Sequence, residues 1–350
     1  MNNAYRAQVD TANTAGPGEP RTPPPQNRRT MRTMTEAKAG DKDFGRLSEP
    51  FRRELLAYCY RMLGSVDEAE EVVQDVYLDA WRAYNAFEGR SSLRTWLYRI
   101  ATRACFKALE KSRRRPLPAD LGAPQTDLDA ALGAQTREVP WLQPIPDFLF
   151  TTAPVDPATV VVQRQTMRLA LVGALQQLPP RQRAVLILRD VLQWRTAEVA
   201  QLLEMTTAAV NSALQRARAQ VPLSQDDLIE PAEPRQRALL DRYVTAFETA
   251  DVDQLVAVLT EDARWEMPPI ATWFEGRDTI LAFLAKQMRV IGPAALVPTS
   301  ANGQPAFAVY ARGHDGARHP HALHVLTLTT EGASRIVAFH GSGLFPLFGL

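Results

Sequence analysis

The segment from Leu178 to Arg218 constrains the fold most, because it has the pattern of two short helices joined by a tight turn. Apolar residues recur every three or four positions in both halves, as one buried helix face requires. Thr196 is expected to cap the first helix and Thr206 the second, because a threonine hydroxyl accepts a backbone N–H hydrogen bond there. The outward face of the second helix then carries Thr207, Ala208, Asn211, Ser212, Gln215, Arg216 and Arg218. Such a face is typical of a helix that reads DNA, although an ordinary surface hairpin of helices would share the apolar pattern.

Length, charge and cysteine content limit the class of protein. The chain has 350 residues, enough for two or three domains of ordinary size, and a net charge of +1. A nearly neutral molecule has no general attraction for nucleic acid, so DNA affinity has to come from local basic patches. Cys59 and Cys105 lack the spacing of metal ligands. We therefore expect no metal, no disulfide framework and two half-buried, reduced thiols.

The sequence contains no segment suited to a membrane. No apolar run approaches the roughly 18 residues that span a bilayer. The beginning of the chain is polar and rich in proline, without the apolar stretch of a secretory signal. We therefore expect a cytoplasmic protein without a membrane partner.

Shifts in composition predict a multidomain chain with two all-α domains and one α+β domain. Apolar helical periodicity alternates with stretches rich in proline, glycine and charged residues. The predicted order is a disordered tail over 1–43, a helical domain over 44–115, a Pro-rich linker over 116–158, a helical domain over 159–221, a short linker over 222–234 and an α+β domain over 235–350.

The first helical domain contains an acidic strip. Ser65 and Glu68 have capping-box spacing, and an apolar face follows them up to a helix end expected near Trp81. The opposite face carries the acidic and amide side chains Glu70, Glu71, Gln74 and Asp75. A solvated face and a docking surface for a basic protein are the two interpretations, and the residues alone leave both open.

A basic ridge follows on the next predicted helix. Cationic side chains recur every four residues opposite the face of Leu93, Leu97, Ile100, Ala104 and Ala108. The ridge consists of Arg99, Arg103, Lys107 and Lys111, and the loop before it carries Phe87, Arg90, Ser91 and Ser92. Cations in a row suit a phosphate backbone, and some of this charge would also suit the negative end of the helix dipole. Trp96 and Tyr98 are candidates for stacking on unpaired bases or for simple core packing.

These segments together resemble the bacterial RNA polymerase sigma factors of the extracytoplasmic-function type. The resemblance rests on DEAEEVVQDVYLDAW, GRSSLRTWLYRIATRACFKAL and LPPRQRAVLILRDVLQWRTAEVAQLL, in this order, over about residues 45–221. It implies a region-two domain that binds the polymerase clamp and the melted minus-ten element. It also implies a region-four domain whose recognition helix reads the minus-thirty-five element in the major groove.

The resemblance also assigns roles to residues. It makes Glu70, Glu71, Gln74 and Asp75 the clamp-binding face, and it places Phe87, Arg90, Ser91 and Ser92 in the loop that holds a flipped base. It makes Asn211, Ser212, Gln215, Arg216 and Arg218 part of the recognition helix. Two positions depart from the family pattern: Arg103 replaces an asparagine, and Glu204 replaces a glycine in the helix–turn–helix. A left-handed backbone at Glu204 would cost about 1 kcal/mol.

The last 115 or so residues are too many for a tail, and their pattern predicts an α+β domain. Helices are expected through Ala250 and over 252–259, followed by a strand at 264–267 and a third helix. Strands are predicted at 295–300, 306–312, 321–329 and 335–339, the first two of them joined by an Asn302–Gly303 turn. The phrases WEMPP and FEGRD resemble the SnoaL-like, nuclear-transport-factor-two-like cone, and the whole chain resembles sigma factors with such a domain fused at their end.

The cone is the place where a small-molecule pocket is expected. Trp265, Trp273, Tyr310 and His324 are its candidate lining residues, with core packing as the alternative for each of them. Strand alternation places His321 on the opposite face from His324. No catalytic residue and no cofactor are predicted. In the linker, the apolar island VPWLQPIPD at 139–147 is expected to dock on the cone or on region four, with a local turn as the alternative. The terminal LFPLFGL is expected to pack back on the protein.

The sequence therefore predicts a non-catalytic promoter-specificity subunit. Its partners would be core RNA polymerase and promoter DNA, in duplex and melted form. Regulation in cis by the cone would make a dedicated anti-sigma factor unnecessary, and any ligand of the cone is unknown. The alternatives are a DNA-binding regulator that never contacts polymerase and an enzyme with a catalytic cone.

Overall fold

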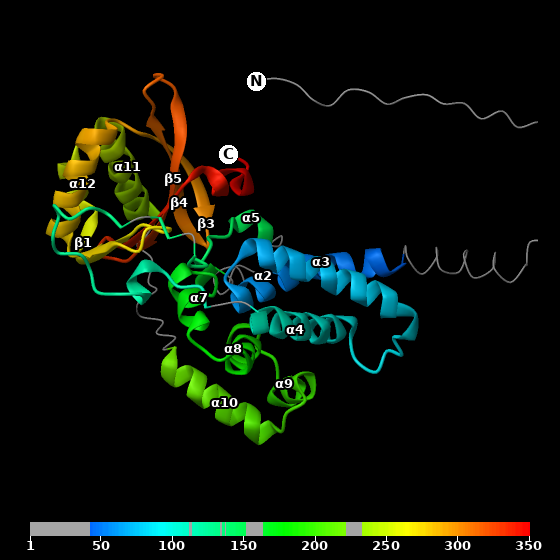
Figure 1. Ribbon diagram of the computed structural model, residues 1–350. Helices are drawn as coiled ribbons and strands as arrows, with labels where there is room; N and C mark the ends of the chain where they lie inside the picture. Colours follow the sequence, from blue (N-terminus) through cyan, green and yellow to red (C-terminus); the bar gives the residue numbers. More distant parts are fainter. Residues whose placement is uncertain (1–42, 112–113, 134, 137, 152–163, 222–232) are drawn as a thin grey trace, which may run out of the picture. The chain divides into compact units, whose positions relative to one another are not determined.

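Three helices of the first helical domain pack side by side in the computed structural model (Figure 1). The structure describes residues 43–111, 114–133, 135–136, 138–151, 164–221 and 233–350. Parts of the predicted tail (1–42) and short linker (222–232), and the predicted boundary at 158/159, lie outside the described residues. The elements are η1 (Glu49–Phe51), α2 (Arg52–Leu63), α3 (Val66–Ala83), η2 (Tyr84–Ala86) and α4 (Leu93–Lys111).

The start of α3 follows from its cap. The Ser65 hydroxyl oxygen accepts a hydrogen bond from the Glu68 N–H at 3.2 Å, as predicted. The Glu68 carboxylate does not turn back to complete a capping box, because it forms an ion pair with Arg115 at 2.6 Å. The helix continues past Trp81 to Ala83.

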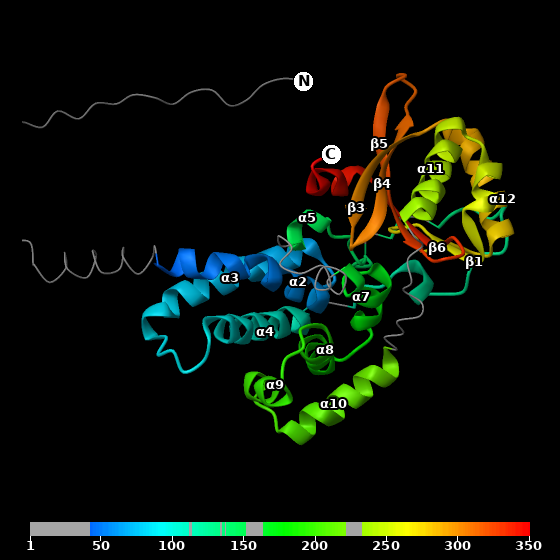
Figure 2. The same cartoon turned by 180° about the vertical axis from the view of Figure 1, so that it is seen from behind.

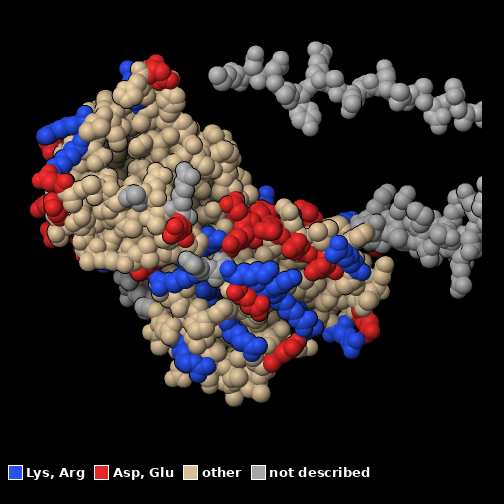
Figure 3. Space-filling view, viewed as in Figure 1, with Lys and Arg blue, Asp and Glu red and all other residues tan. Residues whose placement is uncertain are grey.

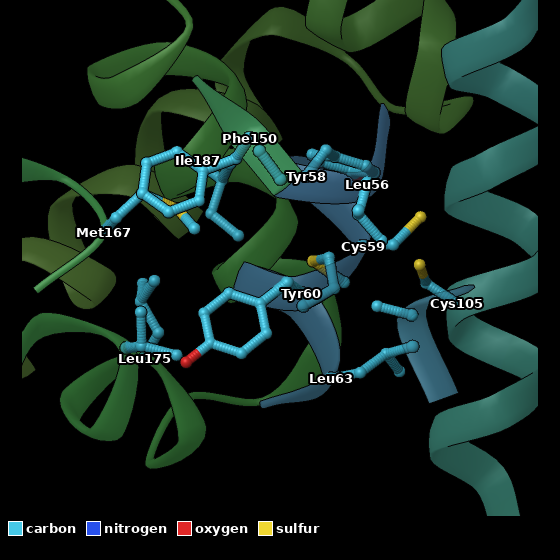
Figure 4. Packing of buried hydrophobic residues seen from close by; sticks show 14 of the residues in the cluster. Leu56, Tyr58, Cys59, Tyr60, Leu63, Cys105, Phe150, Met167, Leu175 and Ile187 are labelled. Atoms are coloured by element: carbon cyan, nitrogen blue, oxygen red, sulfur yellow. The ribbon is translucent and has the colours of Figure 1, made fainter. Parts of the chain in front are cut away.

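The two cysteines are closer and more buried than the sequence predicted. Cys59 on α2 and Cys105 on α4 are both fully buried, and Figure 4 shows their sulfur atoms facing each other. A hydrogen bond between the two thiols, together with burial, raises the pKa of Cys59. Helix packing, which sequence spacing does not reveal, brings them together.

The second helical domain contains the predicted helix–turn–helix. Its elements are α7 (Leu169–Gln176), α8 (Pro180–Leu186), the π-helical turn η4 (Ile187–Val191), α9 (Thr196–Leu203) and α10 (Thr207–Gln220). Thr206 caps α10 by accepting from the Ala209 N–H at 3.1 Å. The prediction that Thr196 caps α9 was wrong. Arg195 holds the cap position, since the Glu198 carboxylate accepts its N–H at 2.8 Å and Thr196 becomes the first helical residue.

The C-terminal domain is an α+β cone around a mixed six-stranded sheet. The strand order is β2-β1-β6-β5-β4-β3, with β1 and β6 parallel and the other neighbours antiparallel. Helices α11 and α12 cover one face of the sheet, and the C-terminal turn η7 lies on the other (Figure 2). The elements are α11 (Glu233–Thr249), η6 (Val252–Ala257), β1 (Leu259–Glu266), β2 (Trp273–Glu275), α12 (Arg277–Ile291), β3 (Ala295–Ala301), β4 (Gln304–Arg312), β5 (Arg318–Leu328), β6 (Ala333–His340) and η7 (Ser342–Phe348).

Within the described ranges of the chain, buried side chains form two cores. One lies inside the cone, between the sheet and the helices α11 and α12. The other runs through both helical domains and includes apolar residues of the opposite face of the sheet. Phe345 and Phe348 of the terminal segment belong to this second core, so that segment packs back as predicted. Among the described residues, no helix is long and apolar enough to cross a membrane.

Candidate nucleic-acid interface

The outward face of α10 is exposed and polar, as its sequence predicted. Val210, Ala213, Leu214 and Ala217 are buried and fasten the helix to its domain. This leaves an exposed surface of amide, hydroxyl and cationic side chains, which are the groups that contact base edges and phosphates. It consists of Thr207, Asn211, Ser212, Gln215 and Arg216.

Arg218 has a different environment from the rest of this face. Its guanidinium makes two hydrogen bonds to the Asp190 carboxylate, at 2.7 and 2.8 Å, and the Asp190 side chain is mostly buried. A paired guanidinium of this kind ties α10 to η4. Arg218 is therefore a structural anchor for the helix, while its side chain stays 58% exposed.

The turn between α9 and α10 contains Glu204, the residue that stands where the family pattern has glycine. Glu204 has φ of 56°, and its N–H bonds to the Ala200 carbonyl as the helix ends. Glycine adopts this backbone without cost, whereas an L-residue with a side chain loses roughly 1–2 kcal/mol. The turn therefore keeps its shape with glutamate at the price of local strain.

The predicted acidic strip on α3 is largely exposed. Glu71, Gln74 and Asp75 are exposed, whereas Glu70 is half-buried and forms an ion pair with Arg52 at 2.9 Å. Two large apolar side chains that the sequence analysis missed lie further along the helix: Leu78 is 50% and Trp81 46% exposed. Their helical spacing from Glu71 places them near the acidic strip, but this spacing does not reveal that they are exposed. Acidic and exposed apolar groups together are typical of a protein-binding surface.

A groove separates this acidic helix from the basic helix α4. It has a volume of about 730 Å³, and Figure 3 shows acidic side chains over α3 bordering basic ones over α4. Arg103, Lys107 and Lys111 form the basic wall. Arg99, the fourth residue of the predicted ridge, does not line the groove and is half-buried. The opposite wall and the floor are formed by Glu68, Glu71, Asp75, Asp79, Val72, Trp96, Ile100, Ala104 and Ala108.

The loop before α4 contains a small aromatic cluster. Phe87 lies between Tyr84 and Trp96, with ring centroids 6.4 and 4.8 Å away. Arg90 is exposed and pairs with Glu88 at 2.8 Å. Ser92 caps α4 by accepting the Thr95 N–H at 3.1 Å, and Ser91 next to it is partly exposed.

The two helical domains contact each other through buried aromatic residues. Tyr98 on α4 is fully buried, which favours core packing over base stacking among its two interpretations. Its ring lies 5.1 Å from Trp194 in the second helical domain. The Arg94 guanidinium lies over both rings, at 5.2 and 5.3 Å, and donates to Glu54 at 2.9 Å. Aromatic and cation–π contacts that exclude water stabilise this interface.

The two residues that depart from the family pattern form an ion pair across the same interface. Arg103 of the basic ridge donates to the carboxylate of Glu204 in the helix–turn–helix. Both side chains are mostly exposed, so the pair adds only about 0–1 kcal/mol. Its importance is geometric, because it brings the basic ridge and the turn that orients α10 into contact.

The tip of the β3–β4 hairpin inserts between these domains. Asn302 is fully buried with φ of 57°, the left-handed conformation that the predicted turn requires. Its amide nitrogen donates to Tyr60 Oη at 2.8 Å and to the Met167 carbonyl at 2.7 Å. Its amide oxygen accepts the Ile145 N–H at 2.9 Å. One side chain therefore joins the cone, the linker, helix α2 and the segment that leads into α7.

Neighbouring groups complete this contact. Tyr60 Oη donates onward to the Gln143 carbonyl at 2.7 Å, and Figure 4 shows the Tyr60 side chain among the buried residues. Burial raises the pKa of Tyr60, which keeps its hydroxyl protonated. The Gly303 N–H donates to the Asp147 carboxylate at 2.7 Å, at the start of α5 (Asp147–Phe150). The Asn302 amide and the Gly303 N–H at the hairpin tip are thus hydrogen-bonded.

The Pro-rich linker lies along the cone before it reaches the hairpin. The Ala119 N–H, in η3 (Pro118–Asp120), donates to the buried Glu266 carboxylate at 2.9 Å. The Trp273 indole donates to the Gly122 carbonyl at 2.9 Å, and the Thr136 N–H donates to the Pro269 carbonyl at 2.9 Å. Further on, Leu142 and Ile145 are fully buried, which confirms that the apolar island docks, and Trp141 is partly buried.

A partly open cavity lies in the cone between its sheet and α12. Of the predicted pocket residues, Trp265 and His324 line it. Trp273 and Tyr310 do not: the linker covers Trp273, and Tyr310 packs against Phe345 on the other face of the sheet. His321 also lines the cavity, contrary to the alternation expected along its strand.

A β-bulge explains the position of His321. Val309 pairs with Ala322, and the next residue of β4, Tyr310, pairs with Pro320. The residue between them is skipped, and such an extra residue shifts the faces of a strand. His321 and His340 then lie with ring centroids 5.2 Å apart.

Comparisons with known families match each of these parts. The Sigma-70 region 2 model matches residues 47–115, the Sigma-70 region 4 model matches 168–221, and the SnoaL-like domain model matches 240–339. The first two cover the helical domains, and the third covers most of the cone.

Two curated sigma factors are similar in sequence over most of this chain. The ECF RNA polymerase sigma factor SigG of Mycobacterium tuberculosis is 51% identical over 314 residues, which are 88% of this chain and 84% of the relative. SigJ of the same organism is 27% identical over 252 residues, 70% of this chain and 73% of the relative. The crystal structure of SigJ superposes with a TM-score of 0.57 at 21% identity, covering 85% of this chain and 97% of that one. It has the same fold.

Proposed function

Because the chain belongs to the extracytoplasmic-function sigma factors of RNA polymerase, we propose that the contact between its two DNA-binding domains is a closed state, which opens for promoter binding. A sigma factor is a non-catalytic subunit that binds core polymerase and directs it to promoters. The single observation that carries the proposal is the Arg103–Glu204 ion pair between region two and the region-four turn.

Distance supports this interpretation. The minus-ten and minus-thirty-five elements are separated by about 25 base pairs, or roughly 85 Å at 3.4 Å for each pair. While Arg103 and Glu204 are in contact, region two and region four cannot bind their two promoter elements at the same time. The pair also occupies Arg103, which would otherwise contact phosphate.

Region four would read duplex DNA through the exposed α10 residues, and region two would hold the melted strand through the basic wall of the groove and the aromatic loop. Core polymerase would bind the exposed acidic residues of α3 together with Leu78 and Trp81. Regulation would be in cis, since the cone and linker hold the closed state through Asn302, and a dedicated anti-sigma factor would be unnecessary.

Replacing Glu204 with glycine tests the closed state. Glu204→Gly removes the ion pair and also relieves the left-handed strain, so region four itself is not destabilised. We expect promoter binding by the full chain with core polymerase to tighten by up to about fivefold, the worth of an exposed pair. The measurement is a promoter-binding titration at low salt, repeated in the Arg103→Ala background. An equal gain in that background would contradict the proposal, because Glu204 would then act without Arg103.

Charge reversal tests the polymerase surface. In the double variant Glu71→Lys/Asp75→Lys, two exposed acidic groups of α3 become basic. We expect core-polymerase affinity to fall roughly tenfold to a hundredfold, because like charges would then face a basic partner. Duplex binding by region four should be unchanged. Glu110→Lys, on the exposed side of α4, is the matched control, and an equal loss with this variant would count against the assignment.

A further inference from the structure

The end of the β4–β5 hairpin forms a two-stranded ribbon that is separate from the rest of the sheet. The pairing of β3 with β4 stops at Tyr310, and the pairing of β6 with β5 begins at Ala322. Between these points, residues 311–320 are paired only across the hairpin within the described ranges. Figure 1 and Figure 2 show this end of the hairpin extending past α11 and α12. Residues 311–320, the β4–β5 ribbon, therefore have both strand edges open to a partner.

Two arginines lie directly opposite each other on this ribbon. Arg312 of β4 is the register partner of Arg318 of β5, and both residues are exposed. The side chains of such a pair stand on one face with their Cβ atoms about 5 Å apart, and like charges there destabilise the pair. Neither guanidinium has an ion-pair partner in the described part of the chain. The protein itself therefore leaves this pair of arginines without a counter-charge.

The carboxylate of the ribbon does not supply that counter-charge. Asp315 at the turn accepts from the Ala317 N–H at 3.0 Å, and its carboxylate lies 2.9 Å from His319 Nε2. The hydrogen bond to His319 lowers the pKa of Asp315, so the carboxylate is ionised and engaged inside the turn. The remaining ribbon residues are alanine, glycine, histidine and proline. The exposed charge of the two arginines is thus available to an anionic partner.

The composition of the ribbon favours nucleic acid over an acidic protein as its partner. Protein interfaces depend on aromatic and large aliphatic anchors, and residues 311–320 contain none of them. A guanidinium binds phosphate through two parallel N–H groups. A two-stranded β-ribbon also has the width that the major groove of duplex DNA admits. Shape and charge together therefore indicate the phosphate backbone of a duplex.

The attachment of the cone keeps the ribbon close to promoter DNA. The linker between the two DNA-binding domains is hydrogen-bonded to the cone at Ala119 and Ile145. With regions two and four on their two elements, as the proposed function has them, this linker spans the duplex between these elements. A cone that is held on the linker then lies beside that duplex.

We infer that the β4–β5 ribbon is a DNA contact of the cone, separate from regions two and four, which binds the phosphate backbone of duplex DNA without reading its sequence. Arg312 and Arg318 each bind a phosphate group, whose negative charge offsets the repulsion between the two guanidinium groups. The contact gives the cone a share in the affinity for promoter DNA, in addition to its proposed role in regulation.

The salt dependence of duplex binding tests this contact. The full chain and its Arg312→Gln/Arg318→Gln variant are each titrated with a duplex of arbitrary sequence at several salt concentrations. The loss of two phosphate contacts should reduce the slope of log affinity against log salt by about 1.8, so that wild type loses roughly tenfold more affinity than the variant between about 50 and about 200 mM salt. The double variant Arg242→Gln/Arg289→Gln, which changes exposed arginines of α11 and α12, is the matched control and should keep the wild-type slope.

Arg216→Gln separates a failure of this inference from a failure of the proposed function. Arg216 is exposed on α10, and its loss should reduce the same slope by about 0.9 when region four binds duplex DNA as proposed. A reduced slope with Arg216→Gln and a wild-type slope with the ribbon variant would overturn the inference alone. The two arginines would then only protect the open strand edges from pairing with other chains. The opposite pattern would remove the region-four assignment and support the ribbon contact.

A label at the tip of the ribbon distinguishes DNA from protein as the partner. Cys59 and Cys105 are fully buried, so a thiol-reactive fluorophore on the folded His314→Cys variant attaches at the exposed turn. We expect duplex DNA to change the emission of this label and core polymerase alone to leave it unchanged. A response to core polymerase without a response to duplex DNA would assign the ribbon to an acidic protein surface and overturn the inference.

Discussion

Asn302→Gly should release the cone from the helical domains and raise promoter-dependent transcription by the full chain more than tenfold. The variant keeps the left-handed turn, where φ is 57°, and removes only the side chain. It leaves Tyr60, Met167 and Ile145 each without one buried partner, at a cost of roughly 1–3 kcal/mol for a group that stays unsatisfied. Hydrogen exchange at the Ile145 amide and transcription with core polymerase are the two measurements. Protection at Ile145 equal to wild type would refute the role of Asn302.

The neighbouring glycine offers a separate check on this contact. A Cβ at Gly303 would lie 2.8 Å from the Arg164 backbone, whereas a Cβ at Gly316, on the next hairpin, would have nothing within 4 Å. Both glycines have positive φ, 68° and 77°, so both alanine variants carry the same local strain. Only Gly303→Ala should loosen the cone, and Gly316→Ala is its control.

Glu266→Gln should destabilise the cone by about 3 kcal/mol. The Glu266 side chain is fully buried, and its carboxylate pairs with Arg335 at 2.5 Å while it accepts the Ala119 N–H at 2.9 Å. Removing one charge of a buried pair leaves the other uncompensated, which typically costs 3–5 kcal/mol. Thermal unfolding of the full chain, followed at cone tryptophans, measures the loss. Glutamine retains an acceptor for Ala119, so the loss reports mainly on the charge.

Glu275→Gln is the matched control for this variant. Glu275 pairs with Arg264 at 2.9 Å, also across neighbouring strands, but both side chains are more than a third exposed. Such a pair is worth about 0–1 kcal/mol, so unfolding should hardly change. Equal destabilisation by the two variants would contradict the importance of burial.

The sequence predicted those features of the fold that depend on residues close together in the chain. Helical periodicity and the Thr206 cap defined α10, and the Asn302–Gly303 pair marked the β3–β4 turn, because both signals depend on neighbours in the chain. The polar face of α10 followed from the same periodicity. The acidic strip was equally visible, although the exposure of Leu78 and Trp81 beside it was not, since apolar residues at helical spacing are more often buried.

Other features depended on partners that are distant in sequence. Asp190 pairs with Arg218, Trp194 packs against the buried Tyr98, and the linker covers Trp273. The position of His321 depended on a bulge that strand alternation does not encode. None of these is visible in spacing along a single segment, which is why the candidate sites were predicted only in part.

The route of the linker determines where the cone goes when the molecule opens. The segment that joins regions two and four is hydrogen-bonded to the cone at Ala119, Thr136 and Ile145, and the cone is also covalently attached after region four. The cone is therefore attached at two places, by hydrogen bonds to the linker and by the chain after region four. While these hydrogen bonds hold, the cone remains beside the linker that connects regions two and four. We therefore expect the cone to stay bound in the initiation complex with polymerase.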